Sequence, residues 1–211
     1  MSRNADPPDG TLAALRERWR RLPVLPVLRT STSAEAIAAA EQLVESGVGV
    51  LELTSTTAGW EEATQVLLRD HPEVVVGLGT VRDADTARRA EDAGLAFLVS
   101  PHPVPGVREA VGVPLVEGGW SPAELAGASA HGIAKLFPAH VGGTAYLRTV
   151  RAVLPDAEIV PTGGIEPADV EEWLDAGALA VGLGSSLTAA LSERPEETAD
   201  WFAGLAARST P

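Results

Sequence analysis

Cysteine is absent from this chain of 211 residues, so neither disulfide bonds nor thiolate metal sites can form. Cations are also scarce: 16 Lys and Arg residues face 29 Asp and Glu residues, which gives a net charge of -13. That charge argues against nucleic acid and anionic membrane surfaces as partners. If the substrate is an anion, local groups must bind it against the overall field.

Long hydrophobic runs are missing too. No apolar stretch reaches the length of a membrane span once its glycines, prolines and charges are counted. The first ten residues, MSRNADPPDG, are polar and contain no apolar core of a secretory signal. We expect residues 1–10 to be a disordered tail, residues 11–211 to form a single domain, and the protein to be cytoplasmic.

Lysine is almost absent, since fifteen of the 16 basic residues are Arg and Lys135 is the only Lys. Lys135 lies in the apolar run IAKLFP, where a charged ammonium is costly and a neutral amine is favoured. Only a primary amine can condense with a ketone, which a guanidinium cannot do. Lys135 is therefore the candidate Schiff-base nucleophile. The alternative is a lysine at a strand end that reaches out to water.

What is present is a regular alternation. A segment with helical periodicity at residues 11–21 precedes the first of eight apolar runs, and the runs are separated by amphipathic, Ala-rich segments. The runs typical of strands lie at residues 22–29, 48–54, 74–80, 96–101, 114–119, 133–138, 158–164 and 179–186. Eight β-then-α units predict a (β/α)₈ barrel, with the first helix covering its bottom. An open, doubly wound sheet is the competing fold, but no GxGxxG motif follows the first strand.

In such a barrel, chemistry collects where the strands end. Glu52 lies between two leucines, so its carboxylate either pairs with a cation or has a raised pKa, and both suit a general acid/base. The alternative is a structural ion pair with Lys135 or Arg29. Arg29 ends the first strand and could bind a substrate carboxylate, or could be an ordinary exposed arginine. The sequence does not reveal which side chains face the barrel interior.

Two glycine-containing stretches follow the last two strands, Thr162-Gly163-Gly164 and Gly182-Leu183-Gly184-Ser185-Ser186. Loops at these positions often bind phosphate through backbone N–H groups, although tight turns would also require glycine. The four histidines show no metal-ligand spacing with carboxylates at strand ends, so we do not expect a metal. One of them, His140, is near enough to Lys135 to be an auxiliary acid or base, or an ordinary loop residue.

With these residues in place, the chain resembles the class I KDPG aldolases and their KDPGal relatives from about residue 22 to 187. The shared motifs are LPVLR (25–29), VLELT (50–54), VGLGTV (76–81), KLFPA (135–139), PTGGI (161–165) and GLGSSL (182–187). The resemblance implies an imine on Lys135 and acid/base catalysis by Glu52, without a cofactor and in a homotrimer. It implies that the substrate-binding residues are Arg29, Thr56, Thr80, Pro101, Phe137 and Thr162. The phosphate would be bound by Gly163, Gly164, Gly184 and Ser185.

Three positions depart from the pattern of the KDPG enzymes. Thr56 stands where they carry an arginine for the substrate carboxylate; the galactonate-type relatives use an arginine at the end of strand one, here Arg29. Glu117 replaces a proline and would add a carboxylate near an anionic ligand. His140 stands where many members have Glu or Ser. These departures affect the substrate more than the reaction class.

The predicted reaction is cleavage of a 2-keto-3-deoxy-6-phospho sugar acid to pyruvate and glyceraldehyde 3-phosphate. Two alternatives stay open. One is a pyruvate aldolase for an unphosphorylated or specialised 2-keto-4-hydroxy acid such as 4-hydroxy-2-oxoglutarate. The other is a barrel that binds a phosphorylated ligand without turning it over.

Overall fold

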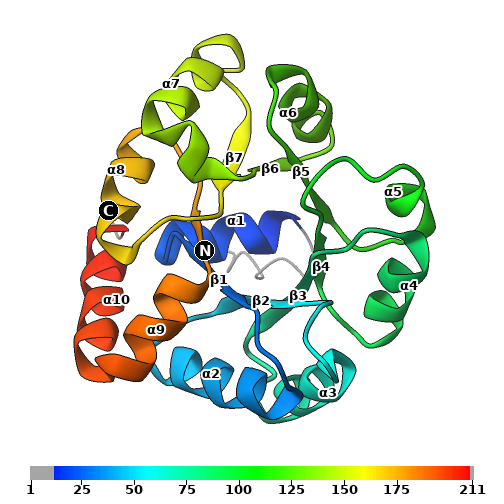
Figure 1. Cartoon of the computed structure of the whole chain (residues 1–211), viewed down its shortest axis with the longest axis vertical. Helices are drawn as coiled ribbons and strands as arrows, with labels where there is room; N and C mark the ends of the chain where they lie inside the picture. Colours follow the sequence, from blue (N-terminus) through cyan, green and yellow to red (C-terminus); the bar gives the residue numbers. More distant parts are fainter. Residues whose placement is uncertain (1–11, 210–211) are drawn as a thin grey trace, which may run out of the picture.

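Eight parallel strands form the centre of the computed structural model, which describes residues 12–209 (Figure 1). They pair in the order β7-β6-β5-β4-β3-β2-β1-β8, and a bridge between Thr162 and Gly182 joins β7 to β8 and closes the barrel. The strands are β1 (Val24–Leu28), β2 (Val50–Thr54), β3 (Val75–Gly79), β4 (Phe97–Val99), β5 (Leu115–Gly119), β6 (Ile133–Leu136), β7 (Glu158–Pro161) and β8 (Val181–Leu183). The predicted (β/α)₈ barrel is confirmed, and the open sheet is excluded.

Apart from the first, the helices surround the strands in sequence order (Figure 1). They are α1 (Leu12–Arg21), α2 (Ser33–Glu45), α3 (Trp60–Asp70), α4 (Ala84–Asp92), α5 (Val107–Ala110), α6 (Pro122–Ser129), η1 (Ala139–Val141), α7 (Gly143–Val153), η2 (Pro167–Asp169), α8 (Val170–Asp175), α9 (Ser185–Glu193) and α10 (Pro195–Ser209). Each of the eight predicted strands exists, but most are shorter than expected. The predicted eighth strand ran too far, because α9 begins at Ser185. The predicted tail at residues 1–10 lies outside the described residues.

Alternating side chains along the strands create two buried layers. One layer, between strands and outer helices, contains residues such as Leu51, Leu53 and Ala134. The other fills the barrel interior with the residues of opposite parity: Leu25, Val27, Val50, Val75, Phe97, Val99, Val116, Ile133, Val160 and Ala180. Parallel strands covered on both faces must be apolar on both faces, which explains the continuous hydrophobic runs in the sequence.

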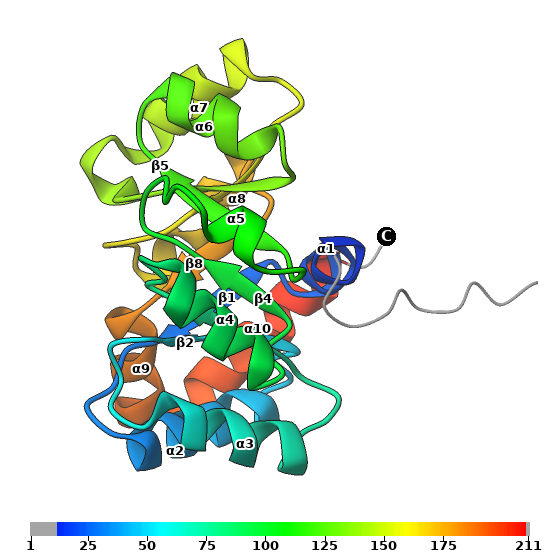
Figure 2. The same ribbon diagram turned by 90° about the vertical axis from the view of Figure 1, so that its right-hand side faces the viewer.

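Helix α1 closes the amino-terminal end of the barrel. Leu15 and Trp19 belong to the same buried cluster as the interior residues. Arg16 binds Glu158, the first residue of β7, with its Nε 2.9 Å from Oε1. Figure 2 shows α1 beside one end of the strands, and in Figure 1 it crosses behind the barrel centre. The expectation that this helix covers the bottom is confirmed, and the opposite, carboxyl-terminal end stays open for a site.

None of the helices within residues 12–209 combines the length and the apolar character that crossing a bilayer requires.

Candidate active site

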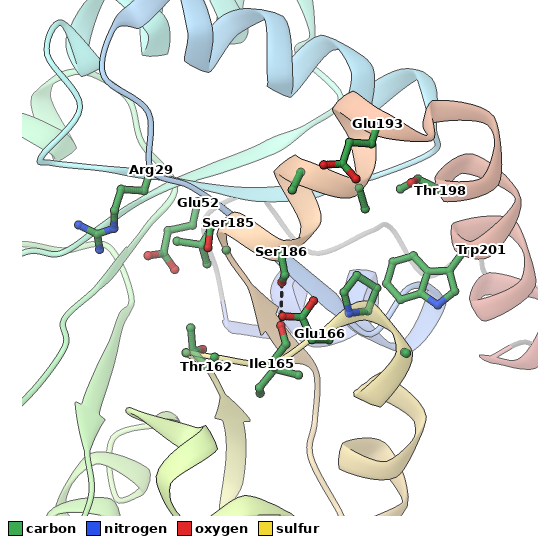
Figure 3. A pocket seen from close by; sticks show the side chains of 18 of the residues that line it. Arg29, Glu52, Thr162, Ile165, Glu166, Ser185, Ser186, Glu193, Thr198 and Trp201 are labelled. Carbon is green, nitrogen blue, oxygen red and sulfur yellow. Dashed lines mark hydrogen bonds between the residues drawn. The ribbon is translucent and has the colours of Figure 1, made fainter.

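A pocket of about 960 Å³ opens at the carboxyl ends of the strands (Figure 3). Its inner part is lined by interior-facing side chains of β1, β2 and β6 and by the loops after β6, β7 and β8. Among the residues predicted from the sequence, it contains Arg29, Glu52, Lys135, Phe137, Thr162, Gly163, Gly164, Gly184 and Ser185. The fold therefore brings together residues that lie more than a hundred positions apart in the chain, such as Arg29 and Ser185.

Lys135 and Glu52 face each other across the barrel interior. Lys135 is paired in register with Gly118 and Val160, and Glu52 with Val27 and Gly77. Lys135 Nζ lies 3.8 Å from Glu52 Oε1, and the two residues are 6% and 1% exposed. This separation exceeds a hydrogen bond, so the two groups are not bonded to each other, and a water or a substrate hydroxyl beside them can contact both.

The Glu52 carboxyl has a raised pKa and one oxygen atom without a hydrogen-bond partner among residues 12–209. Burial raises its pKa, and the nearby positive charges of Lys135 and Arg29 offset part of that effect. Its Oε2 atom and Thr162 Oγ1 are buried without a hydrogen-bond partner among residues 12–209. Buried polar atoms without partners are uncommon, and both of these residues line the pocket. They are therefore available to a ligand, and a carboxyl with a raised pKa suits proton transfer near neutral pH.

Two glycines on β3 make room for this arrangement. A Cβ atom at Gly77 would overlap the ring of Phe97, and one at Gly79 would overlap the carboxylate of Glu52. The signal for this was present in the sequence Gly77-Leu78-Gly79, where both glycines share one parity, but sequence reasoning missed it. The Glu52 carboxylate can occupy its position only because β3 has no side chain beside it.

Gly79→Ala should therefore displace the Glu52 carboxylate. We expect kcat to fall at least about tenfold, since acid/base groups contribute roughly 10² to 10⁴ and tolerate little misplacement. Overpacking should also destabilise the fold by about 1–3 kcal/mol. Steady-state kinetics and thermal unfolding measure both effects. The matched control is Gly127→Ala on α6, where a Cβ meets nothing within 4 Å. Unchanged kcat in Gly79→Ala would contradict the packing argument.

Arg29 projects from the end of β1 toward the same side of the pocket as Glu52 (Figure 3). Its two terminal nitrogens donate to the hydroxyls of Thr56 and Thr80, at 3.0 and 3.1 Å. These two threonines were expected to touch the substrate. The structure instead places their hydroxyls on Arg29, and neither is among the residues that line the pocket. Pro101 is also outside the lining, with its backbone packed against Gly118.

The loops after β7 and β8 form the far wall of the inner pocket. Gly163 and Gly164 have φ values of 98° and 68°, a region that favours glycine. Among residues 12–209, the backbone N–H groups of Gly164 and Ser185 have no acceptor, while Thr162 and Gly182 form the backbone bridge beside Gly163. Ser185 opens α9, so its N–H belongs to a helix N-terminus that carries a partial positive charge. These groups have the polarity that an anion requires, and phosphate binding at these loops stays a prediction.

His140 braces the first of these loops. Its backbone N–H and its ring Nδ1 both lie 3.1 Å from the carbonyl oxygen of Gly163. A Cβ at Gly164 would lie 2.6 Å from the ring, so the imidazole packs directly on that glycine. Of its two predicted roles, the loop residue fits, because the ring is bonded to backbone and is not among the residues that line the pocket.

Glu117 was expected near an anionic ligand, and this expectation is wrong. It is paired in register with Ala134, whose side chain belongs to the outer layer, so Glu117 points away from the barrel interior. Its carboxylate accepts from the Val104 N–H at 3.1 Å and from Arg108 at 3.3 Å. Glu117 is thus a structural residue between β5 and α5.

The pocket also extends outward, beyond the predicted residues. Its outer part runs between η2 and the helices α9 and α10, where Glu166 and Trp201 line it (Figure 3). Trp201 has the sequence context of a packing residue on a helix, and nothing in its spacing signals a pocket. The contribution of α10 depends on the way this last helix returns to the mouth of the barrel, which periodicity does not reveal.

Chemically, the site combines a buried primary amine, a buried carboxyl, an exposed guanidinium and an array of free N–H donors. Within residues 12–209, no three His, Cys, Asp or Glu side chains come together in a group that could hold a metal ion. The amine can form an imine with a carbonyl compound, and the carboxyl can move protons beside it.

Comparison with known proteins agrees with this chemistry. A family model described as KDPG and KHG aldolase matches residues 15–201. A 2-dehydro-3-deoxy-phosphogluconate aldolase from Pseudomonas aeruginosa is 35% identical over 161 residues, which are 74% of this chain and 73% of that protein. A 2-dehydro-3-deoxy-6-phosphogalactonate aldolase from Escherichia coli K12 is 30% identical over 181 residues, or 81% and 87% of the two chains.

A solved structure is similar as well. It is a KDPG aldolase from Legionella pneumophila with pyruvate captured as a covalent carbinolamine intermediate. Its identity to this chain is 29% and the TM-score is 0.74, over 93% of this chain and 98% of that one.

Proposed function

This chain belongs to the KDPG and KHG aldolase family and is a class I aldolase, and on that premise we propose that Lys135 forms the imine and Glu52 moves the protons. The observation that carries the proposal is the 3.8 Å separation of Lys135 Nζ from Glu52 Oε1 inside the barrel. An amine and a carboxyl buried together can exchange a proton through an intervening hydroxyl or water.

The reaction begins when the neutral amine of Lys135 adds to the C2 ketone of the substrate. Loss of water from the carbinolamine, assisted by Glu52, gives an iminium. Glu52 then removes the proton of the C4 hydroxyl, and the C3–C4 bond breaks as the C4 oxygen forms the carbonyl of the leaving aldehyde. The electron pair of the broken bond forms the C2=C3 double bond of an enamine, and the π pair of the iminium returns to nitrogen. Protonation of C3 and hydrolysis of the imine release pyruvate and restore the amine. A carboxyl whose pKa is raised by burial can both give and accept these protons.

The other groups bind the ends of the substrate. Arg29 would hold the carboxylate, because its guanidinium forms hydrogen bonds to two neutral hydroxyls and to no carboxylate of residues 12–209. The N–H groups of Gly164 and Ser185, together with Gly163 and Gly184, would hold a phosphate. Phe137 and Thr162 would line the space between, and holding both ends places the reacting carbons beside Lys135.

The direct test is reductive trapping. Borohydride in the presence of pyruvate should add the mass of a reduced pyruvate imine to the peptide that contains Lys135. Absence of an adduct, or an adduct on the N-terminal amine alone, would contradict the proposal. Peptide mapping is simple here because the chain has no other lysine.

The proposed substrate is a 2-keto-3-deoxy-6-phospho sugar acid, cleaved to pyruvate and glyceraldehyde 3-phosphate. The second candidate is 4-hydroxy-2-oxoglutarate, which the name of the matching family includes. If the loops after β7 and β8 bind phosphate, the phosphorylated substrate should exceed its unphosphorylated analogue in kcat/KM by about 100-fold or more. Equal values, or a preference for 4-hydroxy-2-oxoglutarate, would favour the second candidate.

Two expectations from the sequence stay predictions. A homotrimer is expected, and light scattering on the eluting protein would measure its mass. A cytoplasmic location is also expected, which cell fractionation would check.

A further inference from the structure

Arg29 is the most exposed of the charged groups in the inner pocket, yet its guanidinium is held in place. Hydrogen bonds to Thr56 Oγ1 and Thr80 Oγ1 use one N–H on each terminal nitrogen. Two of the five guanidinium donors are thus occupied, and three remain. An exposed arginine normally samples many rotamers, so two side-chain bonds at its tip restrict it before any ligand binds.

The hydroxyl of Thr56 is itself anchored. It lies 3.2 Å from Thr54 Oγ1, which donates to the carbonyl oxygen of Leu28 at 3.2 Å. Leu28 immediately precedes Arg29 on β1, while Thr54 ends β2. These contacts lead from the Arg29 side chain through Thr56 and Thr54 back to the backbone at the end of β1. The position of Thr56 is therefore fixed relative to the backbone that carries Arg29.

Thr80 is held in an unusual conformation. Its φ is 59°, and it is the single non-glycine residue with positive φ in the part of the chain that the structure describes. A β-branched residue is strained in this region. The hydroxyl of Ser55 donates to the Thr80 carbonyl oxygen at 2.8 Å, and the Ser55 N–H donates to Gly79 O at 2.9 Å. The end of β2 thus fixes the turn that directs Thr80 Oγ1 to Arg29.

From these contacts we infer that Thr56 and Thr80 are positioning residues that orient Arg29 for the carboxylate of the substrate, with Ser55 holding Thr80 in place. The inference rests on the proposed function, since it takes Arg29 as the carboxylate ligand. This role explains why a threonine occupies a strained backbone position. Glycine would adopt the same conformation without strain, but it has no hydroxyl to accept a hydrogen bond from Arg29.

The experiment uses pyruvate alone as the probe. The quantity measured is the pyruvate concentration that gives half-maximal borohydride trapping on Lys135 in the full-length protein. Thr56→Val and Thr80→Gly should each raise it about three- to tenfold, while the trapping rate at saturating pyruvate changes less than about twofold. Thr56→Ser and Thr80→Ser retain the hydroxyl and should restore affinity. Thr80→Gly should keep or increase the thermal stability, so weaker binding could not be ascribed to unfolding.

A double-mutant cycle with Arg29→Gln identifies the route of the effect. If the threonines act through Arg29, neither change should alter half-saturation by more than about 1.5-fold in the Arg29→Gln background. An equal effect in both backgrounds, or unchanged half-saturation in the single variants, would overturn the inference. Thr149→Val, on the outer helix α7, controls for loss of a threonine hydroxyl elsewhere. Failure of the wild-type protein to form any adduct would instead overturn the proposed function.

Discussion

Replacing Lys135 by arginine should abolish aldol cleavage, with a loss of kcat on the order of 10⁴ or more. Arginine keeps the positive charge next to Glu52 but cannot form an imine, so the variant separates covalent catalysis from electrostatics. Lys135 is almost completely buried, with 6% of its surface exposed. No water-exposed amine of the described chain can take over its role, because the sequence contains no other lysine. Cleavage of the substrate and borohydride trapping with pyruvate both measure the effect.

Lys135→Met is the matched control for size. Arginine is larger than lysine and overpacks a full interior, whereas methionine approximates the lysine stem without its amine. Both variants should lose turnover and trapping, although their thermal stabilities should differ. Turnover retained in either variant would show that cleavage does not pass through an imine on this residue.

Glu52→Gln should lower kcat by roughly 10² to 10⁴, because the amide cannot give or accept the protons of the reaction. Its shape matches that of the carboxyl, so the space beside Gly79 stays filled. Pyruvate should still become attached to Lys135 under borohydride, but more slowly. Glu45→Gln, an exposed carboxylate on α2, is the control. Full kcat in Glu52→Gln would remove Glu52 from the mechanism.

The same variant should change the dependence of stability on pH. Burial raises the pKa of Glu52, so between the unfolded and folded values the folded state binds more protons than the unfolded state. The contribution of this group to stability is therefore complete below the unfolded pKa and is lost as pH rises through the folded pKa. Melting temperatures from pH 4 to pH 8 should shift progressively in favour of Glu52→Gln relative to wild type. A difference that stays constant with pH would contradict the raised pKa.

The barrel could be predicted because its signals are local. Parallel strands covered on both sides appear as short apolar runs, and eight such runs alternate with amphipathic segments. Lys135 and Glu52 could be predicted because charged residues inside apolar strands are rare and need a reason. Their meeting at 3.8 Å follows from the shared inward parity that the fold imposes.

What could not be predicted depends on register and on loop conformation. Glu117 is a carboxylate near the end of a strand, as a site residue would be. Its place in the alternation of β5 points its side chain away from the barrel interior and toward Arg108. Thr56 reaches Arg29 from the loop after β2, and Thr80 reaches it from a residue position with φ 59°, which no sequence pattern predicts for a threonine. Trp201 reaches the pocket only through the path of α10. Each of these outcomes is set by contacts between segments distant in the chain.

The burial of a sole lysine has a practical meaning for protein chemistry. Reagents that acylate, carbamylate or crosslink amines find one side-chain target in this molecule, and that target lies at the bottom of the pocket. Apart from Lys135, only the N-terminal amine can react with these reagents. The extent of labelling at Lys135 is therefore a direct readout of whether the pocket is occupied, and a lysine introduced on the surface would be the single lysine outside the pocket.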